Sequence, residues 1–374
     1  MFDNFNNQLD DLLQRVGQKL QISKSQRELA ENRYLSVGTW LSKDETYFKG
    51  KDVLIYPQGS LSINTTVKPR KQQEYDLDLV CEINESWQGK DPIKLLDSIE
   101  RRLREHETYK KMVERKNRCI RLNYANEFHM DILPAHPTDK GNNTNVKVPD
   151  RKAEDWKDSN PKGYAQWFND QLEQYWHVLM EKKAASIQPL PIDEDLNRKP
   201  PLKRAVQLIK RYRDIYFEDD LEFAPISIVL TTFAGMYYNG EVSVNEAIDG
   251  ILEKVILNIP QDGRLKVFNP TNKEEELSER WEGRPDLYEK FLDFIRDFKQ
   301  HWNKLNKLEG IKDVATELKL MFGETIIEES LKEQAELVEK NRTANTLFIA
   351  SSGVLVAASK ENTVQVRTNT FYGQ

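Results

Sequence analysis

The sequence predicts an α+β fold with a mixed β-sheet core, a long N-terminal helix and a mostly helical C-terminal lobe. Apolar residues recur at helical spacing between residues 5 and 48, gather into short runs between 52 and 148, and return to helical spacing beyond Pro161. Strands and helices segregated along the chain in this way are typical of α+β proteins. A chain of 374 residues, 38% of them hydrophobic, is also long enough for two packed lobes.

The N-terminal region, residues 5–48, is predicted to form two helices. Leu9, Leu12 and Leu13 recur at helical spacing in the first. Ser23 opens the second, longer helix, because serine favours the position just before a helix begins.

The short apolar runs that follow predict the strands of one mixed sheet. Polar turns bound each run, and one interval at 93–105 has helical spacing instead. The predicted strands span residues 53–56, 75–83, 119–124, 128–133 and 145–148.

The second half of the chain is predicted to be helical. Prolines at 189, 191, 200 and 201 indicate a crossing between lobes, so we place the boundary near residue 195. The predicted domains are a sheet lobe with the N-terminal helices at 1–195, a helical lobe closing a cleft at 196–340, and a flexible tail at 341–374. The predicted helices of the second lobe span 202–216, 226–238, 244–257, 286–305, 314–322 and 326–340.

Composition excludes several classes of protein. A net charge of -6 argues against general coating of nucleic acids as the function, because binding to phosphates would need a local basic patch. Only Cys81 and Cys119 are present, which excludes a disulfide framework and a zinc site of several thiolates. The longest weakly polar stretches have 13 residues, fewer than the roughly 18 of a membrane-spanning helix. Without an export signal at the N-terminus, the cytosol is the expected location.

The residues that can carry chemistry form an ordered series along the chain. Gln58, Gly59 and Ser60 follow the first predicted strand, and Asp76 and Asp78 lie within the second. Side chains two residues apart on a strand point to the same face, so these two carboxylates share one pocket wall. Such close like charges repel each other, and a divalent cation between them removes the repulsion.

A third acid, Asp131, stands inside another apolar run of the same predicted sheet. Carboxylates without nearby thiolates suit a hard cation such as Mg²⁺, with Mn²⁺ as an alternative. Asp76, Asp78 and Asp131 are therefore the candidate catalytic and metal-binding residues of a site for two ions, which lie roughly 3.5–4 Å apart in such centres.

Other residues in the series suit a triphosphate. Gly59 and Ser60 offer close backbone approach, N–H groups and a hydroxyl. Lys203 and Lys210 lie two turns apart on one face of the predicted helix 202–216, where they could reach the same phosphates. Each signal alone also fits an ordinary turn, a solvated strand face or a basic helix edge. Their ordered combination favours a functional site.

This series resembles the DNA polymerase β-like nucleotidyltransferases, whose signature is Gly-Ser, a helix and a strand bearing Asp-x-Asp. The residues at 56–60, 74–80, 129–135 and 202–214 resemble more closely the bacterial cGAS/DncV-like nucleotidyltransferases, or CD-NTases, of the CBASS antiphage systems. The resemblance extends from about residue 25 to about residue 305.

The resemblance implies an enzyme that joins ATP and other nucleoside triphosphates into a cyclic di- or trinucleotide second messenger, with release of pyrophosphate. An effector protein would act downstream through that product. Ser227 matches a phosphate-binding serine of the family, and Lys210 a phosphate-binding lysine. The two cysteines lie far apart in the sequence, so the zinc thumb with which the animal member of this family binds DNA cannot be present. The nucleotide-binding residues would thus be Gln58, Gly59, Ser60, Lys203, Lys210 and Ser227.

The C-terminal residues 369–374 resemble tails that ubiquitin-transfer-like partner enzymes conjugate to targets in some of these operons. An ordinary frayed terminus fits this segment equally well. Two other functions also stay open at this point: a nucleotidyltransferase that makes linear oligonucleotides or RNA tails, and an inactive scaffold that only binds nucleotide. The intact acid series argues against the scaffold, because buried acids without metal chemistry are costly to maintain.

Overall fold

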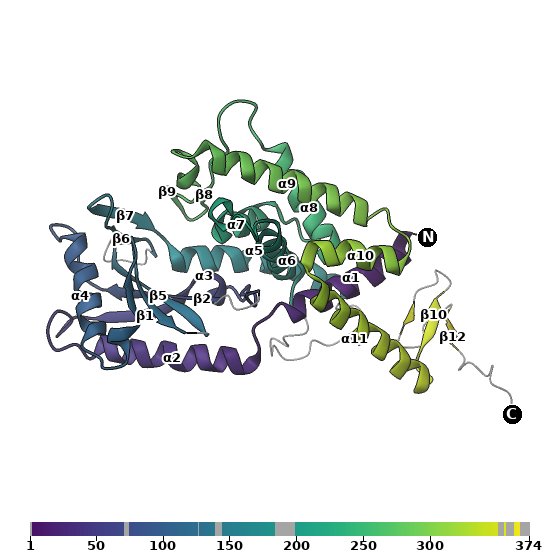
Figure 1. The fold of residues 1–374 in the computed structure, drawn as a ribbon, viewed down its shortest axis with the longest axis horizontal. Coiled ribbons are helices and arrows are strands. Elements are labelled where there is room, and N and C mark those ends of the chain that lie inside the picture. The colour runs from purple at the N-terminus through teal and green to yellow at the C-terminus, as the bar shows by residue number, and fades with distance from the viewer. Residues whose placement is uncertain are drawn as a thin grey trace.

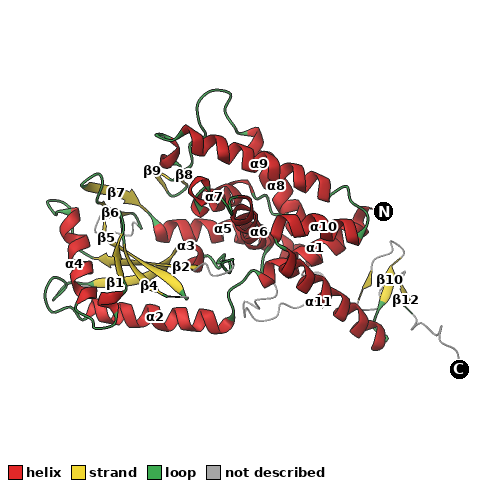
Figure 2. Ribbon diagram, viewed as in Figure 1, coloured by secondary structure: helices red, strands yellow, loops and turns green. Residues whose placement is uncertain are grey.

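The structure, a computed structural model, describes residues 2–70, 75–125, 127–138, 144–183, 199–350, 355–356 and 363–366. Its main β-sheet lies in one lobe and most of its helices lie in the other (Figures 1 and 2). A small separate sheet follows α11 (Glu324–Thr343) near the C-terminus. The predicted α+β class is confirmed.

The first lobe is built on a seven-stranded mixed sheet. Its central pair, β2 (Tyr75–Ile83) and β5 (Phe128–Pro137), is parallel, and the other pairs are antiparallel. The strand order is β1-β2-β5-β4-β3, with β6 paired to β5 and β7 paired to β6. The remaining strands are β1 (Val53–Gln58), β3 (Val113–Arg115), β4 (Ile120–Tyr124), β6 (Val146–Asp150) and β7 (Asp155–Ser159).

Alternation along β2 separates a core face from a polar face. Leu77 and Leu79 are buried in a hydrophobic core shared with α2 (Lys24–Ser42) and α4 (Pro92–Arg104). Successive side chains of a strand point to opposite faces, so Asp76 and Asp78 lie on the face away from this core. The leucines of β2 therefore fix the orientation of its two acids.

The second lobe is a cluster of helices around one large core. It includes α1 (Phe2–Lys19), whose Leu9, Leu13 and Val16 are buried in that core. The domain prediction grouped both N-terminal helices with the sheet, whereas α1 packs on α6, α8 and α11. The predicted boundary near residue 195 lies outside the described residues. The other helices of this lobe are α5 (Pro161–Lys183), α6 (Pro201–Tyr216), α7 (Ser227–Tyr237), α8 (Val244–Leu257), α9 (Pro285–Leu305) and α10 (Ile311–Phe322).

The segment predicted as a flexible tail, 341–374, contains regular structure among its described residues. The last helix, α11, continues to Thr343. Three short strands then form an antiparallel sheet: β10 (Phe348–Ala350), β11 (Leu355–Val356) and β12 (Thr363–Gln365). Their β-branched residues explain the pairing, because such residues favour strands. Residues 369–374, the expected conjugation motif, lie outside the described part of the chain.

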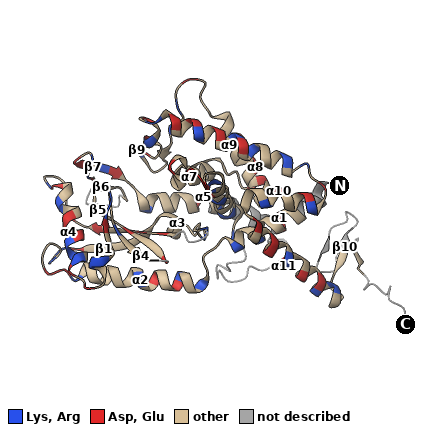
Figure 3. Ribbon diagram, viewed as in Figure 1, with Lys and Arg blue, Asp and Glu red and all other residues tan. Residues whose placement is uncertain are grey.

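Charged residues of both signs are interspersed along the outer helices. Figure 3 shows Lys and Arg side by side with Asp and Glu on α9 and α11. This distribution agrees with the small net charge of -6. Within the described residues, no helix combines the length and the apolar character that a membrane crossing requires.

Candidate active site

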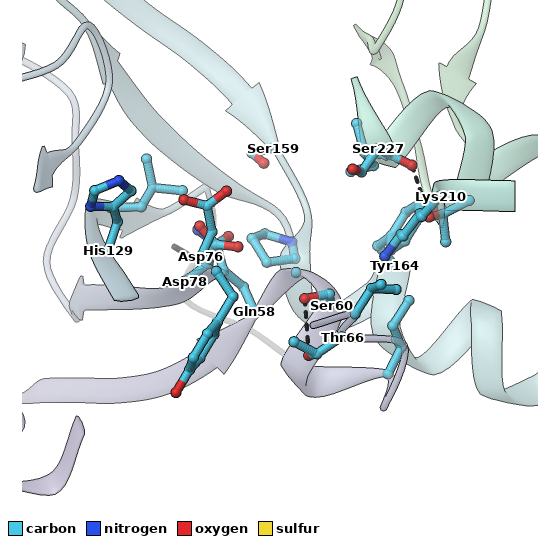
Figure 4. Close-up of a pocket in the computed structure, with 18 of the residues that line it drawn as sticks. Gln58, Ser60, Thr66, Asp76, Asp78, His129, Ser159, Tyr164, Lys210 and Ser227 are labelled. Carbon is cyan, nitrogen blue, oxygen red and sulfur yellow. Dashed lines mark hydrogen bonds between the residues drawn. The ribbon is translucent and has the colours of Figure 1, made fainter. Parts of the chain in front are cut away.

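A cavity of about 860 Å³ lies between the two lobes, a volume typical of small-molecule sites. In Figure 4, Asp76, Asp78 and His129 lie on one side of it, and Lys210 and Ser227 on the other. Two predicted site residues, Asp131 and Lys203, do not line this cavity. The predicted residues that do line it are Gln58, Gly59, Ser60, Asp76, Asp78, Lys210 and Ser227.

Gly59 turns the chain sharply between β1 and the short helix α3 (Gly59–Ser62). Its φ angle is +63°, in the left-handed region that favours glycine. A Cβ atom at this position would also collide with the carboxylate of Asp78. Gly59 therefore allows the turn and leaves room for the neighbouring acid.

The sheet register brings the three predicted acids to one face. Asp78 and Asp131 are direct partners across the parallel pair β2 and β5, and Asp76 lies two residues away on β2. Asp76 keeps 58% of its side chain exposed, whereas Asp131 keeps only 17%. Arg121 on β4 pairs with Asp131 through both carboxylate oxygens, at 2.6 and 2.7 Å. The third acid is thus close to the other two but already has a cationic partner.

The electrostatics of Asp76 and Asp78 oppose full ionisation. Burial, with the nearby carboxylates of Asp76 and Asp131, raises the pKa of Asp78 to about 8. Although 58% of the Asp76 side chain is exposed, the protein that surrounds the cavity desolvates its carboxylate and raises its pKa, and the guanidinium of Arg121 opposes this change. A bound cation would stabilise the ionised form of both acids.

The donor set fits a divalent cation of the magnesium type in its chemistry. All three acids offer carboxylate oxygens, the ligands that Mg²⁺ and Mn²⁺ prefer. Over the described ranges, however, no three acidic, His or Cys side chains are grouped so that they could enclose an ion. Asp76 and Asp78 line the cavity, whereas Asp131 does not, and both carboxylate oxygens of Asp131 are already in contact with Arg121.

Side chains of α6 hold the turn that follows Ser60 in place through hydrogen bonds. Lys210 donates from Nζ to the carbonyl oxygen and the hydroxyl of Thr65, both at 3.2 Å. Gln207 donates to the carbonyl oxygen of Thr66 at 3.0 Å, and the hydroxyls of Ser60 and Thr66 lie 3.1 Å apart. Burial lowers the pKa of Lys210 to about 7, and the nearby Arg213 contributes to this shift. The cavity therefore contains a lysine whose charge changes near neutral pH.

The structure adds Arg213, which is not among the predicted site residues, to the site. Arg213 lines the cavity and donates from Nη1 to the Ser227 hydroxyl at 2.5 Å. It also pairs with Asp214. Helical spacing was the signal available in the sequence, because residues three apart share a helix face and Arg213 follows Lys210 by three.

One predicted site residue, Lys203, and one residue that was not predicted, His129, differ in their positions relative to the cavity. Lys203 is buried in α6, so it is neither a solvated edge nor a part of the cavity wall. His129, the register partner of Asp76, lines the cavity.

A hydrogen bond between the two lobes closes one rim of the cavity: Glu275 accepts from the hydroxyl of Ser159 of β7 at 3.0 Å. The sequence did not predict this rim, because β7 and β9 (Asn272–Glu276) are short and polar.

Comparison with known proteins gives consistent results. Residues 5–171 match the family described as the Second Messenger Oligonucleotide or Dinucleotide Synthetase domain. A c-di-GMP synthase from Roseivirga ehrenbergii is 38% identical over 373 residues, with 99% of this chain and 98% of the relative covered. The cyclic dinucleotide synthase CdnG from Bradyrhizobium diazoefficiens is 25% identical, with 100% and 96% covered. The solved structure of the Bradyrhizobium diazoefficiens CD-NTase CdnG in complex with GTP has a TM-score of 0.71 at 24% identity, over 87% of this chain and 99% of that chain.

Proposed function

Because the chain belongs to the family of second messenger oligonucleotide or dinucleotide synthetases, and is thus a nucleotidyltransferase, we propose that it condenses two molecules of GTP into cyclic di-GMP. One observation carries the proposal: Asp76 and Asp78 face the turn at Ser60 and the polar side chains Lys210 and Ser227 in one cavity. The choice of guanine is supported by the 38% identity to a c-di-GMP synthase over 99% of this chain.

The proposed reaction consists of two equivalent steps. In each, a ribose hydroxyl attacks the α-phosphorus of a triphosphate, first that of a second GTP and then that of the linear dinucleotide. A new P–O bond forms, and the bond from the α-phosphorus to the oxygen that bridges to the β-phosphate breaks. The hydroxyl gives up its proton to solvent, and pyrophosphate leaves with the electron pair of the broken bond. The second step closes the ring, so two pyrophosphates are released in total. This chemistry depends on positioning and on charge stabilisation more than on a protein nucleophile.

Different side chains of the cavity would bind the triphosphate and position the attacking hydroxyl. The turn at Gly59 and Ser60 would receive the triphosphate, and Lys210 and Ser227 would hold it from the helical lobe. Asp76, Asp78 and Asp131 would hold two Mg²⁺ or Mn²⁺ ions, which when bound neutralise the triphosphate and lower the pKa of the attacking hydroxyl. The same acids would fix where that hydroxyl lies relative to the phosphorus.

Product analysis tests the proposal. The purified protein is incubated with Mg²⁺ and each nucleoside triphosphate, alone and in combination, and the products are treated with phosphatase before chromatography and mass spectrometry. We expect GTP alone to give a phosphatase-resistant product with the mass of cyclic di-GMP. The D76N/D78N double variant is the matched control and should form none.

Other products would support the competing functions. A ladder of phosphatase-sensitive linear products would overturn cyclisation and favour an oligonucleotide- or RNA-tailing enzyme. A folded protein that binds GTP without forming any product would favour the inactive scaffold. A cyclic product with other bases would overturn the choice of guanine and retain the reaction.

We also propose that the product acts as a signal in antiphage defence, through a separate effector protein. The resemblance to CD-NTases of the CBASS systems supports this role. The test compares phage plaque formation on cells that carry the operon with wild-type protein or with the D76N/D78N variant. Protection should require the wild-type protein, and equal plaque numbers would contradict the proposal.

A further inference from the structure

The cationic partner of the third acid also reaches the first acid. Arg121 forms a two-pronged contact with Asp131, in which Nε donates to Oδ1 at 2.6 Å and Nη2 donates to Oδ2 at 2.7 Å. The same Nη2 lies 3.4 Å from Oδ1 of Asp76. One guanidinium nitrogen therefore bridges the two carboxylates.

The sheet register makes this bridge possible. Arg121 on β4 is the direct partner of Asp131 on β5, which is in turn the partner of Asp78 on β2. Side chains of register partners lie on the same face, so Arg121, Asp131 and Asp78 form a row across three strands. From this row the guanidinium extends over β5 to Asp76.

The position of Nη2 is the one that a bridging cation requires. An ion that binds Asp76 and Asp131 together must lie between their carboxylates, where Nη2 now donates to both. The contact with Asp131 is strong, because both partners are charged and the geometry is bidentate. The side chains of Arg121 and Asp131 are only 20% and 17% exposed, so solvent screens this ion pair weakly.

We propose that Arg121 is a built-in counter-cation, which occupies the position of the ion shared by Asp76 and Asp131 and must turn away from Asp76 before that ion binds. The inference rests on the proposed function, because it concerns the metal use of the same site. Asp76 and Asp78 stay accessible from the cavity, so an ion that arrives with the triphosphate meets them first. Arg121 would thereby keep the second ion out until the nucleotide is in place.

The test measures ion binding to the free protein, without nucleotide and without turnover. Mn²⁺ alone is titrated into the wild-type protein and the R121Q variant by calorimetry or electron paramagnetic resonance. Loss of a charge-assisted contact that competes with the ion should tighten Mn²⁺ binding at least about tenfold. The gain should disappear in R121Q/D131N, because the shared carboxylate is then missing.

Two further variants control the experiment. Arg104→Gln removes an arginine on α4 that pairs with Glu100, and it should leave Mn²⁺ binding unchanged. Arg121→Lys keeps the charge but lacks the two-pronged contact, so it should give intermediate binding even if R121Q folds poorly. Thermal unfolding of every variant shows whether it is folded during the titration.

Each outcome decides the proposal. Tighter Mn²⁺ binding in R121Q that depends on Asp131 supports it. Unchanged or weaker binding overturns it, and weaker binding would make Arg121 a group that orients Asp131 for the ion. The product assay decides the proposed function separately: cyclic di-GMP from a wild-type protein whose R121Q variant binds Mn²⁺ no better would refute this inference alone.

Discussion

The carboxylate of Asp78 lies in the space that a side chain at Gly59 would occupy. Gly59 has a φ of +63°, and a Cβ atom at this position would collide with the Asp78 side chain. The strand that carries the acids and the turn that would receive the triphosphate are therefore in direct contact. A change at residue 59 should affect both the backbone of the turn and the position of the acid.

Gly59→Ala should abolish most activity, because it adds a collision with Asp78 to the strain of a left-handed backbone. The backbone cost alone is about 1–2 kcal/mol for a residue with a Cβ. Gly50→Ala is the matched control, since Gly50 has a φ of +71° and a Cβ added there would meet no atom within 4 Å. Denaturant unfolding and the product assay measure both variants. If G50A and G59A lose stability and activity equally, the contact with Asp78 has no effect of its own.

Asp78→Asn should lower the rate of product formation about a thousandfold or more, as expected for loss of a ligand that stabilises charge at the reaction centre. The same change should not lower the free energy of unfolding near pH 8, because burial and its acidic neighbours already raise the pKa of Asp78 to about 8. Steady-state rates and denaturant unfolding without metal measure the two effects. An active D78N protein would contradict the role given to this acid.

The sequence predicts the elements of this fold well where apolar periodicity is strong. The predicted strand at 75–83 coincides with β2, and the predicted helix at 244–257 coincides with α8. The strand β7 escapes detection because Asp155 and Lys157 are exposed and polar. The place of α1 could not be predicted either, because an amphipathic pattern shows that one face is buried without showing which lobe covers it.

At the site, the sequence predicts what depends on local pattern and misses what depends on how distant segments pack. Asp76 and Asp78 follow from alternation within one strand, which is local information. The contact between Arg121 and Asp131 depends on which strands are neighbours and in what register, and neither is local. Lys203 was expected at the cleft because it lies two turns before Lys210 on one face of the predicted helix, but α6 is central to its lobe and buries this side chain.

Arg213→Gln should raise KM for GTP about tenfold with a smaller effect on kcat, because a cation that bonds to Ser227 in the cavity would contact the triphosphate. Arg284→Gln is the control for loss of charge, since Arg284 pairs with Asp286 on the surface. Steady-state kinetics measure both variants, and thermal unfolding reports their folding. A KM equal to that of R284Q would remove Arg213 from the nucleotide site.

Lys210 should make nucleotide affinity depend on pH near neutrality. Burial, together with Arg213, lowers its pKa to about 7, so in the free protein Lys210 is charged below pH 7 and neutral above it. A bound triphosphate favours the charged form, and binding above pH 7 therefore takes up a proton. Affinity for a non-hydrolysable GTP analogue should fall as pH rises from 7 to 9, with a limiting slope of about tenfold per pH unit.

The Lys210→Arg variant isolates this effect from other titrations, because its guanidinium stays charged over the whole range. Asp78, whose pKa is raised to about 8, titrates in the same window and is present in both proteins. The difference in slope between wild type and K210R therefore belongs to residue 210. Calorimetric titration between pH 6 and pH 9 measures it. Equal slopes in the two proteins would show that Lys210 binds the triphosphate without changing its protonation, or does not bind it.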